Sequence, residues 1–115
     1  MDSTRQSKIS RLVQKETAQY FINHQSEYTG CIISVTEVRV TSDLDEAKIF
    51  ISIFPQNFRD KVIAKIEENN KQIRFELASI MRHQLRRIPN LEFRLDETLD
   101  YAERINALLD KNSNK

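Results

Sequence analysis

The apolar side chains near the start of the chain recur every three or four residues, as on one face of an α-helix. Ser3 or Thr4 supplies a hydroxyl that can cap this helix, and the pattern fades before Gly30. A first helix is therefore predicted to run from this cap to a point between His24 and Tyr28. Its expected inner positions are Ile9, Leu12, Val13, Tyr20 and Phe21.

Alternating apolar residues then predict two strands, one from Cys31 to Val40 and one from Ala47 to Phe54. The apolar positions change phase between Val35 and Val38, which indicates either a β-bulge or a strand covered on part of both faces. The turn between the strands, residues 41–45, contains no glycine. We expect its Asp and Ser side chains to bond the backbone there instead.

The second half of the chain returns to helical spacing from Gln56 to about Arg87, with a break predicted at Asn69 and Asn70. A half-solvated strand over Leu91–Leu95 follows, and then a last helix from Leu99 to about Leu109. This order, α-β-β-α-α-β-α, predicts an α+β fold whose three-stranded sheet carries helices on one face. The expected inner stripe of the long helical region is Phe58, Val62, Ile66, Ile73, Leu77 and Ile80.

The composition agrees with one globular domain. The chain has 115 residues, of which 39% are hydrophobic and 30% are charged. No apolar run approaches the ~20 residues that a membrane-spanning helix needs. The first ten residues lack the apolar core of a secretory signal, so the cytoplasm is the expected location and no membrane partner is expected.

Side chains suited to catalysis or metal binding are sparse. Cys31 and His83 could form a nucleophile–base pair, but Cys31 stands at a strand start, where a small hydrophobe is common. Metal sites need three or four ligands, and two distant histidines with one cysteine fall short. Gly30 alone cannot build a glycine-rich phosphate loop. The sequence therefore predicts no enzyme, no cofactor, no metal ion and no small-molecule substrate.

The net charge is only +1, but the charges are sorted along the chain. Residues 71–94 hold six basic and two acidic side chains, whereas residues 95–115 hold three basic and five acidic ones. At about 100° per residue, a helix reaching residue 87 places a lysine and three arginines on one face away from the apolar stripe. Planar guanidinium groups suit RNA phosphates, although a solvated face without a partner is the alternative. The predicted RNA-binding residues are Lys71, Arg74, Arg82 and Arg86, with Arg87, Arg5, Lys8 and Arg11 as weaker candidates.

The predicted sheet also carries basic and aromatic side chains. Arg39, Lys48 and Arg94 could extend the basic surface over the exposed face, or could simply keep the strands soluble. Phe50 and Phe54 could stack on RNA bases. We expect them instead to form a second small core under the last helix.

Two stretches resemble the ribosome-binding factor A family. ISVTEVRVTSDLDEAKIFIS, residues 33–52, is similar to the family pattern V-T-x-V-x-V followed by S-x-D-L-x-x-A-K. IRFELASIMRHQLRRIPNLEFRLD, residues 73–96, is similar to its pattern I-R-x-x-L, an arginine, and then P-x-L-x-F-x-x-D. The resemblance covers roughly Arg5 to Tyr101. It implies a single type II KH-like domain over residues 1–115, with a core at about residues 5–97 and a C-terminal helix and tail over residues 98–115.

The resemblance also implies a function. Members of this family are non-catalytic assembly factors that bind the small (30S) ribosomal subunit and its precursor 16S rRNA during late maturation. The expected partner is therefore the free subunit, not the translating ribosome, and a monomer is expected. The alternative is a KH-shaped protein–protein interaction module without rRNA affinity. It would use the exposed phenylalanines or the acidic end: Asp96, Glu97, Asp100 and Glu103.

One departure concerns the kink between the two central helices. The family usually has Ala-x-Gly there, whereas this chain has Asn69, Asn70 and Lys71. Asparagine tolerates the left-handed backbone better than most residues, so we still expect a kink. Lys71 adds a charge that the glycine would not supply.

Overall fold

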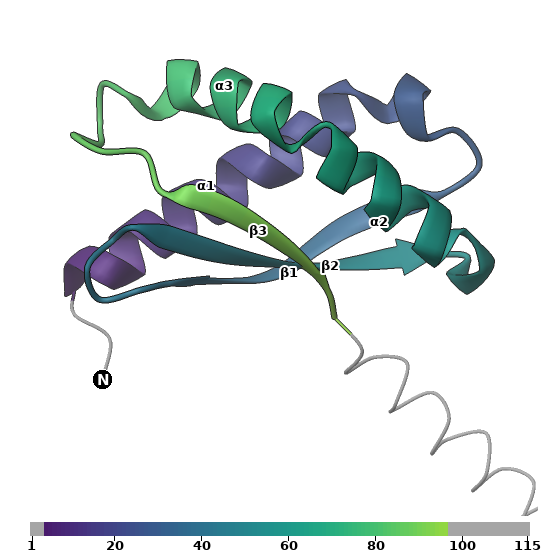
Figure 1. Ribbon diagram of the computed structural model, residues 1–115, viewed down its shortest axis with the longest axis horizontal. Coiled ribbons are helices and arrows are strands. Elements are labelled where there is room, and N and C mark those ends of the chain that lie inside the picture. The colour runs from purple at the N-terminus through teal and green to yellow at the C-terminus, as the bar shows by residue number, and fades with distance from the viewer. Residues whose placement is uncertain (1–3, 97–115) are drawn as a thin grey trace, which may run out of the picture.

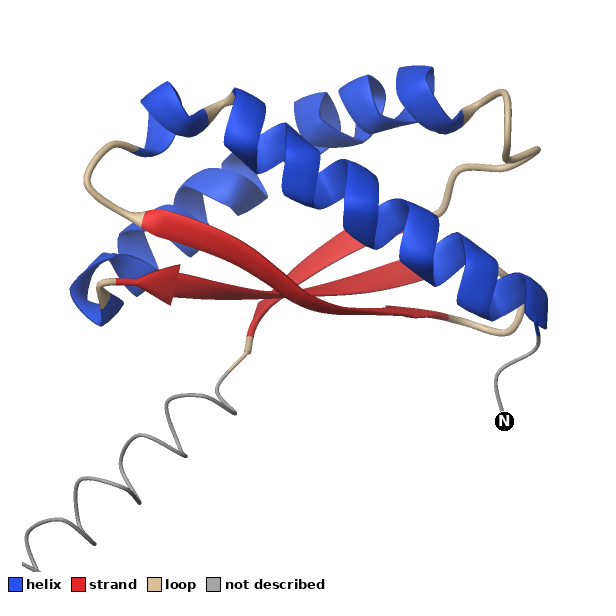
Figure 2. Cartoon of the chain, turned by 180° about the vertical axis from the view of Figure 1, so that it is seen from behind, coloured by secondary structure: helices blue, strands red, loops and turns tan. Residues whose placement is uncertain are grey.

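The computed structural model describes residues 4–96, in which three helices lie on one side of a three-stranded sheet (Figure 1). Seen from behind, the same helices cover the same face of the sheet (Figure 2). The α+β, KH-like prediction is confirmed, while the predicted last helix lies outside the described residues. In chain order the elements are α1 (Thr4–Asn23), η1 (Gln25–Tyr28), β1 (Ile32–Val40), β2 (Glu46–Phe54), η2 (Gln56–Phe58), α2 (Arg59–Glu68), α3 (Asn70–Met81) and β3 (Asn90–Leu95), where η marks a short 3-10 helix.

The sheet has the order β1-β2-β3, with β1 antiparallel to β2 and β2 parallel to β3. The register shifts between Val35 and Glu37, and this shift is the predicted β-bulge. Val35 lies opposite Ile51 and Val38 lies opposite Ile49, so the apolar residues on both sides of the bulge face the helices. The phase change in the sequence therefore reports the bulge.

The core lies between the helices and the sheet. Burial of each large apolar side chain there contributes roughly 1.5–3 kcal/mol. The predicted position Ile80 is wrong, because Ile80 is 49% exposed and Met81 is fully buried in its place. The side of α3 that bears Met81 and Arg74 therefore meets the segment before β3. The most deeply buried aliphatic side chains include Val13, Ile49, Ile51, Ile66, Ile73, Leu77 and Met81.

The predicted break between the central helices is confirmed at Asn69, which has φ −92° and ψ 8°. This φ is negative, so the break requires neither glycine nor left-handed backbone, contrary to the expectation from the sequence. The Asn69 amide donates to the Lys65 carbonyl at 3.0 Å, and the Asn69 carbonyl accepts from the Ile73 amide at 2.9 Å. Asn70 Nδ2 donates to the Leu91 carbonyl at 2.9 Å, which fixes the break to β3.

The helix α3 ends at Met81, well before the predicted end near Arg87. The Gln84 and Leu85 amides both donate to the Met81 carbonyl, at 2.9 and 3.0 Å, and close the last turn. Pro89, which is fully buried, then directs the chain into β3. Arg86 therefore lies in the loop of residues 82–89, and the predicted single helical face of arginines is wrong.

Candidate nucleic-acid interface

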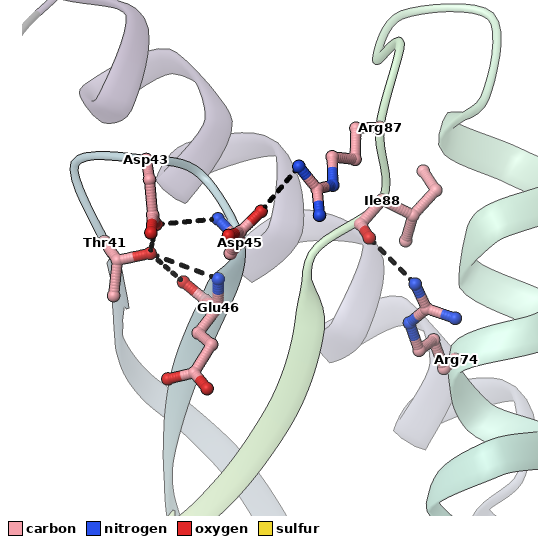
Figure 3. A network of polar contacts seen from close by, with 7 residues as sticks. All are labelled: Thr41, Asp43, Asp45, Glu46, Arg74, Arg87 and Ile88. Atoms are coloured by element: carbon pink, nitrogen blue, oxygen red, sulfur yellow. Dashed lines mark hydrogen bonds and ion pairs between the residues drawn. The ribbon is translucent and has the colours of Figure 1, made fainter.

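The loop of residues 82–89 is held against α3 by Arg74. Arg74 Nε donates to the Pro89 carbonyl at 3.2 Å, and one terminal nitrogen donates to the Ile88 carbonyl at 2.9 Å (Figure 3). The side chain is half-buried. Arg74 was predicted to contact RNA, but its guanidinium is engaged with the backbone of this loop. We therefore assign Arg74 the role of positioning the loop.

Polar side chains hold the backbone of the turn between β1 and β2 in place. Asp43 Oδ1 accepts hydrogen bonds from the Thr41 hydroxyl at 2.6 Å and from the Asp45 amide at 3.1 Å (Figure 3). Both hydrogen bonds lower the pKa of the Asp43 carboxyl, and the bond from the Thr41 hydroxyl has the larger effect. Leu44 has φ 63°, an uncommon conformation for a branched side chain. The prediction that Asp side chains replace glycine in this turn is confirmed for Asp43.

Asp45 connects this turn to the loop of residues 82–89. Its carbonyl accepts from the Asn90 amide at 2.8 Å, and its carboxylate lies 2.8 Å from a terminal nitrogen of Arg87 (Figure 3). Both side chains are solvent-accessible, so the ion pair itself contributes little to stability. The ion pair instead helps to fix the position of the loop, which Asp45 holds at the start of β2 and Arg74 holds against α3.

Four cations meet around a hollow at this end of the molecule. Arg5 and Lys8 come from the first turns of α1, and Arg86 and Arg87 come from the loop. All four are exposed, whereas Ile9 on the same cavity wall is buried. The cavity has a volume of about 590 Å³. We call it the basic hollow; it is lined by Arg5, Lys8, Ile9, Leu12, Asp43, Leu44, Gln84, Leu85, Arg86 and Arg87.

The positive charge continues from the basic hollow along α1. At about 100° per residue, Lys8, Arg11 and Lys15 fall within about 60° of one another, and all three are exposed. They span roughly 10 Å of helix at 1.5 Å per residue. Arg11 was a weaker candidate in the sequence and Lys15 was not one. The helical spacing of these residues was the signal that could have found Lys15.

The remaining predicted residues are distributed along α3. Arg82 is the C-cap residue of the helix and is exposed. Lys71 is the second residue of the helix and lies roughly 15 Å along its axis from Met81. Lys71 is thus at the opposite end of α3 from the basic hollow. The sequence also missed Asp45, since only the fold brings that carboxylate beside Arg87.

The face of the sheet that no helix within residues 4–96 covers, called the uncovered face below, is closer to electrical neutrality. Arg39 lies over the Phe50 ring at 5.5 Å, but it also pairs with Glu37 at 3.0 Å. Arg94 similarly pairs with Glu92 through its Nε at 2.9 Å. Phe54 is 65% exposed, and the predicted core over these phenylalanines involves a helix outside the described residues. These pairings make the sheet face a weaker candidate for RNA than the basic hollow.

The Cys31–His83 pair does not form. Cys31 is buried just before β1, where its thiol donates to the Tyr28 carbonyl at 3.2 Å and burial raises the thiol pKa. His83 is exposed in the loop near the other end of β1, a strand about 30 Å long. Within residues 4–96, no three His, Cys, Asp or Glu side chains converge to hold a metal ion. Over the same range no helix is both long and apolar enough to cross a membrane.

Comparison with known proteins places the chain in a family. Residues 5–109 match the family described as ribosome-binding factor A. The chain belongs to the ribosome-binding factor A family. It is 45% identical to ribosome-binding factor A of Christiangramia forsetii, with 90% of this chain and 81% of the relative covered. It is 40% identical to that of Flavobacterium johnsoniae, with 96% and 88% covered.

A solved structure shows the same fold. The crystal structure of ribosome-binding factor A from Thermus thermophilus superimposes with a TM-score of 0.65 and covers 78% of this chain and 94% of that one. The two sequences are 17% identical, so this likeness concerns the fold alone.

Residues that carry the resemblance to the ribosome-binding factor A family contact one another in the structure. Thr36, at the bulge of β1, bonds the Asp96 carboxylate beyond the end of β3 and the Phe50 carbonyl at 3.2 Å. Arg74 bonds the carbonyl of Pro89. The two sequence motifs are therefore joined in space, and these particular residues maintain the fold that presents the basic hollow.

Proposed function

We propose that the chain binds the small ribosomal subunit by laying the basic hollow and the adjoining side of α1 against phosphates of 16S rRNA, during late subunit maturation. The observation that carries this proposal is the meeting of Arg5, Lys8 and Arg86 from two distant segments around one cavity. Membership of the family supports it, because the relatives are named for binding the ribosome.

Electrostatics favours RNA as the partner of the basic hollow. Four cations line it, of which Arg87 pairs with Asp45, and Asp43 is the one carboxylate among the lining residues that the structure describes. Lysine and arginine side chains on separate elements fit the phosphates and sugars of a folded RNA, and such contacts position a protein more than they read sequence. The role we assign is accordingly non-catalytic and needs no cofactor.

The experiment is a titration of purified small subunits at several salt concentrations. If three or four phosphates are contacted, the logarithm of the binding constant should fall with the logarithm of salt concentration at a slope of about −3. In lysate gradients the protein should migrate with free small subunits and not with translating ribosomes. Binding that salt leaves unchanged would contradict the proposal and would favour a protein–protein interaction module.

A further inference from the structure

Phe75 lies in the middle of α3 and is 75% exposed. A single exposed apolar side chain is ordinary on a protein surface and needs no explanation by itself. Phe75 differs from the apolar residues of α3 that face the core, because those residues are fully buried. At about 100° per residue, Phe75 lies on the other side of α3 from these buried residues.

Two cations flank Phe75 along the same line of the helix. At about 100° per residue, Lys71, Phe75 and Arg82 fall within about 40° of one another. Lys71 precedes the ring by roughly 6 Å along the axis, and Arg82 follows it by roughly 10 Å. Both cations are exposed. The backbone of Arg82 is still in the right-handed helical conformation, so the helical geometry extends to it.

This line carries no negative charge of its own. Within α3, residues 70–81, the one carboxylate is Glu76, which turns toward α1 and lies 3.2 Å from His24 Nε2. The next outward positions after Phe75 are Ala78 and Ser79, whose side chains are too small to cover an aromatic ring. The result is an open ring between two positive charges.

We propose that Phe75 stacks on an unpaired base of the RNA, while Lys71 and Arg82 contact the phosphates on either side of that base. The inference rests on the proposed function, since it takes the RNA of the small subunit as the ligand. Aromatic rings beside cations are the usual platform for single-stranded RNA, because every base has a π-face and every linkage has a phosphate. Folded RNA displays such bases in loops and bulges.

A protein partner fits the same surface less well. Lysine is depleted at the centres of protein–protein interfaces, whereas arginine and aromatic residues are enriched there. Lys71, about one helical turn before the ring, is therefore the residue that favours RNA over a protein partner. Arg82 also begins the loop that bears Arg86, so one RNA strand leaving the basic hollow can continue along α3.

The test uses two labelled RNAs of about 12 nucleotides per strand, a mixed-sequence single strand and a duplex of matched length. Phe75→Ala should weaken binding to the single strand about tenfold and leave binding to the duplex unchanged. Phe75→Tyr should restore the loss, because a tyrosine ring stacks equally well. Phe75→Leu should not restore it. The midpoint of thermal unfolding should be the same in all four proteins, since the ring is exposed.

Several results would overturn the stacking proposal. These are equal single-strand affinities of wild type and Phe75→Ala, full affinity of Phe75→Leu, or a wild-type protein that binds neither RNA. A Phe75→Ala defect seen only with intact subunits would assign the ring to a protein contact instead.

Lys8→Glu combined with Arg86→Glu distinguishes the two proposals. If that variant keeps its RNA affinity while Phe75→Ala loses it, the basic hollow is wrong and the stacking site stands.

Discussion

Replacing Lys8 and Arg86 with glutamate in one protein should reduce its affinity for the small subunit at least about 100-fold. Each replacement removes a charge-assisted contact of roughly 1.5–3 kcal/mol and places a carboxylate against RNA phosphate. Both side chains are exposed, so the fold should remain intact. The measurement is an equilibrium titration of purified small subunits at fixed salt, together with a thermal unfolding curve.

The matched control reverses the same number of charges elsewhere. Lys61 lies on α2 and Arg94 on the uncovered face of the sheet, and both are exposed. Their double replacement by glutamate gives the same net charge as Lys8→Glu/Arg86→Glu. It should cost less than about tenfold in affinity, because only long-range attraction is lost. Equal losses in the two proteins would mean that overall charge, and not the basic hollow, controls binding.

Replacing Arg74 with methionine should destabilise the protein by about 2–3 kcal/mol. Methionine keeps most of the length of the side chain but leaves the Ile88 and Pro89 carbonyls without these donors. Affinity for the small subunit should fall as well, because the loop that bears Arg86 is no longer held. Urea unfolding measures the first effect, and titration of small subunits measures the second.

Arg74→Lys separates this role from a direct contact with RNA. Lysine keeps the positive charge but lacks the planar fork that reaches two carbonyls at once. If Arg74 positions the loop, Arg74→Lys should also be destabilised. A lysine variant with wild-type stability and wild-type affinity would show that the charge alone matters, and would return Arg74 to the RNA-contacting surface.

Much of the fold could be predicted because local signals agree with the final packing. The phase change between Val35 and Val38 indicates the bulge, since a strand with one buried face cannot otherwise switch parity. The pair Asn69 and Asn70 marks the helix break because asparagine favours helix ends over helix interiors. In each case the signal lies in the very residues that form the bulge or the break.

The end of α3 could not be predicted in this way. The sequence RHQLRR after Met81 contains mostly good helix formers, so local propensity favours a longer helix. The helix ends because burial of Pro89 and the bonds from Arg74 pull the chain toward β3. These are tertiary contacts, which override propensity. Because α3 ends early, Arg86 lies at the basic hollow and not on a helical face.

The candidate site was predictable in its residue types but not in its arrangement. The sequence selected Arg5, Lys8, Arg86 and Arg87, and the fold brings these four together from segments almost 80 residues apart. It also selected Lys71 and Arg74, which the fold places at other positions on α3. No spacing rule predicts the Arg87–Asp45 pair, because a loop and a turn meet there.

The most direct test of the basic hollow is ultraviolet cross-linking of the protein bound to purified small subunits, followed by mass spectrometry of the peptides joined to RNA. Binding through the basic hollow should give nucleotide-bearing peptides from residues 5–15 and from residues 82–89, which lie at its two sides. Cross-links confined to the uncovered face of the sheet or to α2, with none from these two segments, would contradict it.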